Sequence, residues 1–189
     1  LYGAVAFSQS AHKAGIKPIF GTEIVQGTQR AILLAKNLQG FAELCRVITD
    51  RHLKPNFSLT ERLKQCGEDV IILCPDREIL RSLLATRGSE NLYFEIDVST
   101  RNRANLCATS LCPVVATNRV RFIRPEDWEL HRLLTAIKAN TTIHSVPTSA
   151  LASRGAWMKS PEEMVRMFQN IPSAIANTLK IAEQCNVEL

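Results

Sequence analysis

Val70-Ile-Ile-Leu-Cys74 is a continuous apolar run with the length of a buried β-strand, and a helix signal follows it directly. Asp76 can cap that helix, which carries Ile79, Leu80, Leu83 and Leu84 at helical spacing. A buried strand followed at once by an amphipathic helix is the repeating unit of α/β proteins. This stretch therefore predicts an α/β fold.

The alternation of strands and helices continues on both sides of this unit. Further extended segments are expected at 16–20, 23–25, 31–35, 92–96 and 113–117. Helices are expected at 4–14 and 59–66, and from Pro172 to near Asn186. Apolar residues at helical spacing indicate two more, one with Phe41, Leu44, Cys45 and Ile48 and one after Pro125 with Leu130, Leu133, Leu134 and Ile137. A further helix should begin at the capping box Ser160-Pro-Glu-Glu163. Short apolar strands between helices predict a parallel sheet covered on both faces, either a barrel or a doubly wound sheet.

The composition is that of a globular protein and argues against several classes. The chain has 189 residues, enough for one domain with a sizeable core, and its net charge of +5 is compatible with a polyanionic partner without requiring one. No apolar run approaches the roughly 20 residues that cross a bilayer. The first residues show no signal peptide, so we expect a cytoplasmic protein without a membrane partner. No glycine-rich nucleotide loop follows a strand, which argues against a Rossmann or P-loop protein.

The cysteines and histidines show no metal-binding pattern. The six cysteines form no Cys-x-x-Cys pair and have no zinc-ligand spacing. Several, such as Cys45, lie among apolar residues, so we expect reduced thiols packed as small hydrophobic groups. The four histidines are scattered, and His131 is expected to pack with its hydrogen bonds satisfied on a helix that faces the core.

Three blocks of the sequence together resemble a known family. The first is Leu1-Tyr-Gly-Ala-Val-Ala-Phe7 with Ala14-Gly-Ile-Lys-Pro-Ile-Phe-Gly-Thr-Glu23, and the second is Leu33-Leu-Ala-Lys-Asn37 with Gly40-Phe-Ala-Glu-Leu-Cys-Arg46. The third runs from Pro113-Val-Val-Ala-Thr-Asn118 through Arg124-Pro-Glu-Asp127 and Lys159-Ser-Pro-Glu-Glu-Met164 to Asn177-Thr-Leu-Lys-Ile-Ala-Glu-Gln-Cys-Asn186. In order and spacing they are similar to the PHP domains of bacterial DNA polymerase III alpha subunits. The resemblance is strong over 1–49 and 113–189 and weak over 50–112.

The resemblance implies a distorted (β/α)7 barrel that is incomplete at its N-terminus and is followed by a helical segment toward a polymerase body. It implies a partial PHP barrel at 1–140, a loop or linker at 141–157, and a C-terminal helical pair at 158–189. Intact members of the family hold metal ions at the strand ends through His, Asp, Glu and sometimes Cys. Their opening His-x-His and Asp-His motifs would lie before Leu1.

Carried onto this chain, the resemblance leaves few metal ligands. Glu23 matches one family ligand, and arginines stand at three other expected ligand positions, Arg30, Arg119 and Arg121. Arginine cannot ligate a metal because its guanidinium stays protonated and has no acceptor. We therefore expect a degenerate site without zinc or manganese, at which Glu23 is an ordinary carboxylate paired with a nearby arginine.

Arg119 and Arg121, with Arg124 close behind, leave three interpretations open. They replace the charge of the lost metal by pairing with acidic residues, they contact phosphate groups, or they form a solvated basic loop. The first makes the chain a structural PHP module of a replicative or error-prone DNA polymerase. Its partners are then the remainder of the alpha subunit and other replisome subunits, with DNA bound and Mg²⁺ used by the parent polymerase.

Two other functions stay open at this point. One is a metal-dependent phosphoesterase or 3′–5′ proofreading nuclease, which rests on Glu23 and the family's chemistry. The other is a basic DNA-binding module that uses the arginines at 119, 121 and 124.

Overall fold

The computed structural model describes residues 1–100 and 111–189, which form two compact units. Among the described residues, the first unit contains 1–95, 111–115 and 176–189, and the second contains 96–100 and 116–175. Residues 158–175 lie in the second unit and residues 176–189 in the first, and the domain ranges expected from the resemblance stay a prediction.

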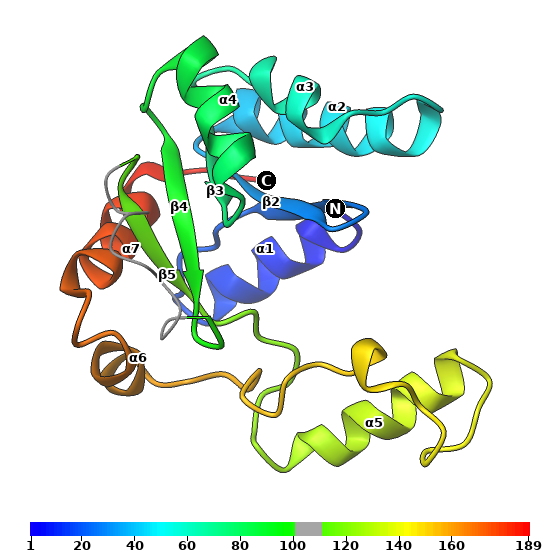
Figure 1. Ribbon diagram of the computed structural model, residues 1–189. Helices are drawn as coiled ribbons and strands as arrows, with labels where there is room; N and C mark the ends of the chain where they lie inside the picture. Colours follow the sequence, from blue (N-terminus) through cyan, green and yellow to red (C-terminus); the bar gives the residue numbers. More distant parts are fainter. Residues whose placement is uncertain (101–110) are drawn as a thin grey trace. The chain divides into compact units, whose positions relative to one another are not determined.

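The strands lie where the apolar runs predict them (Figure 1). They are β1 (Gly21–Gln26), β2 (Gln29–Ala35), β3 (Val70–Cys74), β4 (Leu92–Asp97) and β5 (Val114–Thr117). The expected extended segment at 16–20 lies outside the strands. The strands form one sheet in the order β1-β2-β3-β4-β5, so the α/β prediction is confirmed.

The sheet is mixed, and the expectation of a parallel sheet is wrong for its first half. β1 pairs antiparallel with β2, β2 antiparallel with β3, and β3 parallel with β4. β1 and β2 are antiparallel because a two-residue turn joins them, with Gln26 paired to Gln29 and Gly27 at a φ of 59° that glycine adopts without strain. β2 and β3 are joined through α2 and α3 and are still antiparallel, whereas α4 is the crossover helix between the parallel strands β3 and β4. The seven-stranded barrel stays a prediction.

The helices follow the sequence signals closely. They are α1 (Ala4–Lys13), α2 (Leu38–Leu53), α3 (Leu59–Lys64), α4 (Arg77–Arg87), α5 (Asp127–Lys138), α6 (Pro161–Met167) and α7 (Pro172–Gln184), with a short 3-10 turn at Thr148–Ala150. The Asp76 side chain accepts hydrogen bonds from Glu78 N and Ile79 N, as predicted. The capping box of Ser160 and Glu163 is also confirmed. α5 begins at Asp127, two residues after Pro125.

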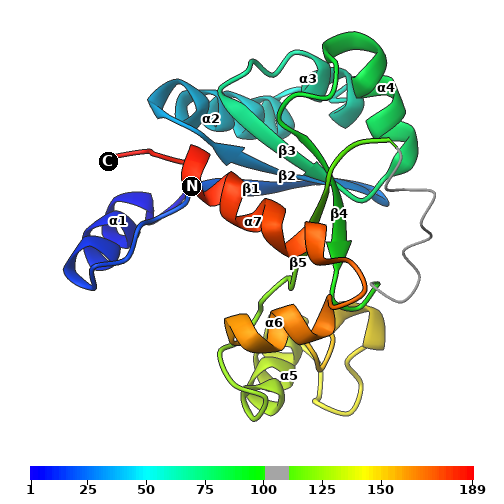
Figure 2. The same cartoon turned by 90° about the vertical axis from the view of Figure 1, so that its left-hand side faces the viewer.

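In the first unit, helices cover both faces of the sheet (Figures 1 and 2). α7 covers one face, where its residues Ile181 and Cys185 pack in a core with side chains of β3, β4 and β5. Ile32 and Leu34 of β2 pack against the same core. Because side chains alternate along a strand, Leu33 points to the other face, where α2 packs on β2.

The start of α2 comes very close to the backbone before β3. A Cβ added to Gly40 would lie 2.2 Å from the carbonyl oxygen of Asp69. The buried residues of α2 are Gly40, Leu44 and Val47, so the face turned to the sheet is rotated from the expected one. Cys45 is exposed as a result, and its expected packing is wrong.

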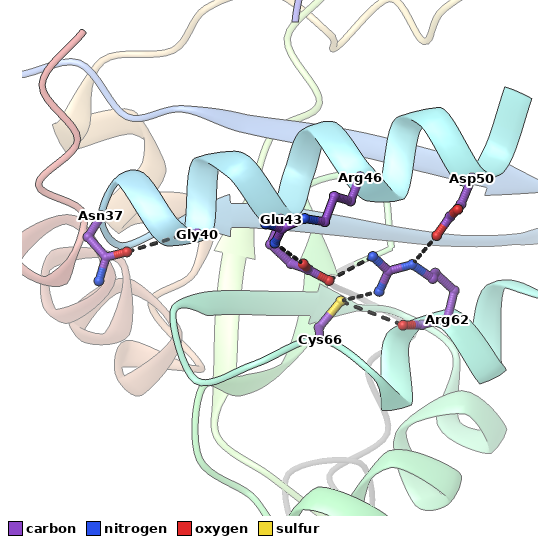
Figure 3. A network of polar contacts seen from close by, with 7 residues as sticks. All are labelled: Asn37, Gly40, Glu43, Arg46, Asp50, Arg62 and Cys66. Atoms are coloured by element: carbon purple, nitrogen blue, oxygen red, sulfur yellow. Dashed lines mark hydrogen bonds and ion pairs between the residues drawn. The ribbon is translucent and has the colours of Figure 1, made fainter.

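A buried arginine joins α2 to α3 (Figure 3). Arg62 Nε donates to Asp50 Oδ2 at 2.7 Å, and its Nη2 donates to Glu43 Oε1 at 2.7 Å. Hydrogen bonds from Lys54 and then from Arg62 hold the pKa of Asp50 below its ordinary value. These charged contacts fix the two helices against each other at their polar edge.

The apolar stripe of α5 does not face a core. Leu130, Leu133, Leu134 and Ile137 are all exposed, and Ala136 is the buried residue of the helix. Helical spacing predicts that a stripe exists but leaves open what covers it. Within 1–100 and 111–189, no helix is both long and apolar enough to span a bilayer.

Candidate functional site

Arg30 lies between two carboxylates at one end of the sheet. Its Nη1 donates to Glu23 Oε1 at 3.1 Å, and its Nη2 contacts Glu95 Oε2 at 2.6 Å. The side chains of Arg30, Glu23 and Glu95 are 13%, 28% and 0% exposed. These three residues are called the Arg30 cluster below.

The register of the sheet brings the cluster together. Arg30 pairs with Val25, so Glu23 lies diagonally across the hairpin on the same face. β3 ends at Cys74, which is aligned with Phe94 of β4. The Arg30 side chain therefore extends past the end of β3 to reach Glu95, one residue farther along β4. This edge lies at the carboxyl ends of β3 and β4, where open α/β sheets commonly place their sites.

The cluster keeps its charge. Burial lowers the pKa of Arg30, but the attraction and hydrogen bonds of Glu95 and then of Glu23 outweigh burial, so the pKa lies above its ordinary value. A permanently protonated guanidinium is a donor to both carboxylates and offers no lone pair. Among the described residues, no three His, Cys, Asp or Glu side chains gather as a metal site would require.

Sequence reasoning predicted Glu23 and Arg30 but missed Glu95. The expected pairing of Glu23 with a nearby arginine is confirmed by its contact with Arg30. A signal for Glu95 is present in the sequence, because it is the one charged residue in the apolar run Leu92-Tyr-Phe-Glu-Ile96. A fully buried carboxylate requires a cationic or hydrogen-bonding partner.

The buried thiols near the sheet are unreactive. Cys74 Sγ donates to the backbone oxygens of Arg30 at 3.5 Å and Asp76 at 3.7 Å. Burial raises the pKa of Cys74 to about 12 and that of Cys66 to about 11. Because the thiolate is the nucleophile and the metal ligand, these groups are neutral packing atoms at neutral pH.

The other two arginines of the predicted site lie in the second unit, on one cavity. Arg119 and Arg121 both line a cavity of about 760 Å³, to which α5 contributes Lys138. We call this cavity the basic cavity. Arg124 is not among its lining residues, so the three arginines do not form one surface there. Lys138 carries no motif and was not predicted.

The wall that carries the two arginines is fixed by pairing of two loop segments. Arg121 N donates to Ala156 O at 2.8 Å, and Asn118 Nδ2 donates to Trp157 O at 2.6 Å. Arg119, which lies between Asn118 and Arg121, has a φ of 44°. This is a left-handed backbone conformation that residues other than glycine rarely adopt. The paired loops hold this conformation in place.

His131 joins α5 to the same loops. Its Nε2 accepts a hydrogen bond from Ala152 N at 2.9 Å, which places the imidazole proton on Nδ1. The ring lies 5.9 Å from that of Phe122. The predicted satisfied packing of His131 is confirmed, although its helix faces loops rather than the expected core.

One carboxylate, that of Asp97, is among the residues that line the basic cavity. Asp97 Oδ1 accepts hydrogen bonds from Ser99 N and Ser99 Oγ, and the residue is buried. No hydrogen-bond donor reaches its Oδ2 within the described part of the chain. The positive charges of Arg119, Arg121 and Lys138 therefore outnumber the negative charge on the lining.

Comparison with known proteins agrees with the sequence resemblance. Residues 1–79 match the PHP domain family. The chain is 30% identical over 98% of its length to the DNA polymerase III subunit alpha of Pseudomonas aeruginosa, and 29% identical over 99% of its length to that of Escherichia coli K12. It spans about a fifth of the length of each of these relatives (19%).

Proposed function

We propose that the chain is the PHP-domain part of a DNA polymerase III alpha subunit and acts there as a structural module, because residues 1–79 match the PHP domain family and nearly the whole chain is similar to such subunits. The rest of the polypeptide would carry polymerisation with its own Mg²⁺, in replicative or error-prone synthesis in the cytoplasm. The partners of the chain would then be the remaining parts of the alpha subunit and other replisome subunits.

The Arg30 cluster is the observation that carries the structural role. A metal-dependent hydrolase needs a cation held by lone pairs and open to water. Here a guanidinium contacts two carboxylates of the sheet edge, at 3.1 and 2.6 Å, and supplies the positive charge from within the chain. The residues present do not fit a metal ion, because Arg30 would have to leave both carboxylates before one could bind.

The same pairing would stabilise this edge of the sheet without a metal ion. A carboxylate as buried as that of Glu95 is costly without a counter-charge. Arg30 provides that charge in a fixed position and joins β2 to β4 across the end of β3. The cluster thus gives the sheet edge the rigidity that a bound metal would give.

A hydrolysis assay tests the structural role. The purified chain is incubated with a 5′-labelled single-stranded oligodeoxynucleotide and Mn²⁺ or Zn²⁺, and shortening from the 3′ end is followed on a gel. We expect no metal-dependent shortening. Shortening that depends on metal and disappears in the Glu23→Gln variant would instead support a phosphoesterase or proofreading nuclease.

The assignment to a polymerase has a separate test in the gene. The coding sequence beyond the codon for Leu189 is read and compared with the part of the relatives that this chain does not span. A frame that continues into a region similar to the polymerase body supports the assignment. A frame that stops or continues into an unrelated protein would overturn it.

A further inference from the structure

The basic cavity concentrates positive charge in a partly open hollow of the second unit. Arg119 and Arg121 enter from the loop after β5, and Lys138 enters from the last turn of α5. The cavity of about 760 Å³ lies within the roughly 300–1,000 Å³ typical of small-ligand sites. Cations from two separate elements thus converge on a space that a small anion can fill.

The backbone of this wall is set in advance of any ligand. Arg121 N and the Asn118 side chain are hydrogen bonded to the segment 156–157. Arg119 is held at a φ of 44°, and such strained conformations persist where the surrounding structure enforces them, commonly at functional sites. Because the backbone of the wall is fixed, binding has to order the arginine side chains but not the loop that carries them.

The guanidinium groups suit phosphate in particular. Each carries five N–H donors in a planar fork that matches two phosphate oxygens. Lys138 adds a point charge on the α5 side. Leu134 and Leu151 supply apolar lining, and the hydroxyl residues Ser99 and Ser149 also face the cavity.

We propose that the basic cavity binds an organic phosphate of nucleotide size, with its phosphate groups on Arg119, Arg121 and Lys138 and its body against Leu134 and Leu151. This goes beyond the structural role proposed above and does not depend on it. A small ligand is favoured over a DNA strand because the cations converge on one cavity. A basic strip that continued along the surface would include Arg124, which lies outside the lining.

Isothermal titration of the 189-residue chain tests the site with three probes: dATP, inorganic triphosphate and deoxyadenosine. We expect dATP to bind, inorganic triphosphate to bind more weakly, and deoxyadenosine to give no measurable heat. Replacing Arg121 by Gln removes one charge-assisted contact and should weaken dATP binding about tenfold. Arg124→Gln is the matched control, because it removes the same charge from an exposed residue outside the cavity, and it should leave binding within about twofold.

Two further variants keep the test decisive. Lys138→Gln removes a cation from a different element, so it tests the cavity even where Arg121→Gln disturbs the loop. Thermal unfolding of each variant confirms that the protein is folded. Absence of dATP binding, equal weakening by Arg124→Gln and Arg121→Gln, or binding of an oligodeoxythymidylate without binding of dATP would each overturn the proposal.

Discussion

Replacing Arg30 by Met removes the counter-charge of the Arg30 cluster while keeping most of the side-chain volume. Removing one partner of a buried ion pair costs about 3–5 kcal/mol. The Arg30 contact with Glu95 is buried, whereas Glu23 is partly exposed and contributes less. Both glutamates have further interactions in the protein, so we expect a loss of about 2 kcal/mol in the free energy of unfolding.

Urea denaturation at neutral pH, followed by circular dichroism, measures this loss. The control is Arg46→Met, because Arg46 also contacts a glutamate at 3.1 Å but is 68% exposed, and it should cost less than about 1 kcal/mol. Adding Glu95→Gln to Arg30→Met should recover part of the stability, since it removes the buried charge left alone. An Arg30→Met variant as stable as the Arg46→Met control would refute the idea that Arg30 neutralises the sheet edge.

Three other properties follow from the described contacts. Gly40→Ala should destabilise the protein by about 1–3 kcal/mol, because the added Cβ would meet a backbone carbonyl. The control is Gly67→Ala, which has open space around its Cβ and should change the free energy of unfolding by less than about 0.5 kcal/mol. Thermal unfolding of the two variants compares them. The lowered pKa of Asp50 contributes stability that is present above its unfolded pKa and is lost as the pH falls through its folded pKa. Asp50→Asn should therefore flatten the acid side of the curve of unfolding free energy against pH, measured by urea denaturation. An unchanged curve would contradict this. Cys45 should react rapidly with a thiol reagent in the native protein at pH 8, while Cys74 stays protected. The Cys45→Ser variant should therefore react more slowly than the Cys74→Ser variant, and equal rates for the two would show that burial does not control thiol reactivity.

The positions of the strands and helices were predictable because each has a strong local signal. Val70–Cys74 is apolar throughout, and the caps at Asp76 and Ser160 fix where two helices begin. Strand direction was not predictable from the same signals, because apolar runs look alike in parallel and antiparallel sheets. The turn at Gly27 makes β2 antiparallel to β1, and its two-residue length becomes clear only once Gln26 and Gln29 are seen to pair.

The candidate sites were predictable only in part. Glu23 and Arg30 were found through a family resemblance, and their partner Glu95 is 65 positions farther along the chain from Arg30, where only the sheet register brings it close. The basic cavity combines Arg121 with Lys138 from a neighbouring helix, and no sequence spacing encodes that contact. Which face of α5 is buried also depends on tertiary packing rather than on the spacing of its leucines.

The metal content of the purified chain tests most directly whether Arg30 takes the place of a metal ion. The chain is expressed in medium supplemented with zinc, manganese and iron, purified without chelator, and analysed by inductively coupled plasma mass spectrometry. We expect only traces of each metal, well below one ion per chain, in the wild-type protein. One or more tightly held ions per chain, lost when Glu23 and Glu95 are replaced by Gln, would contradict it.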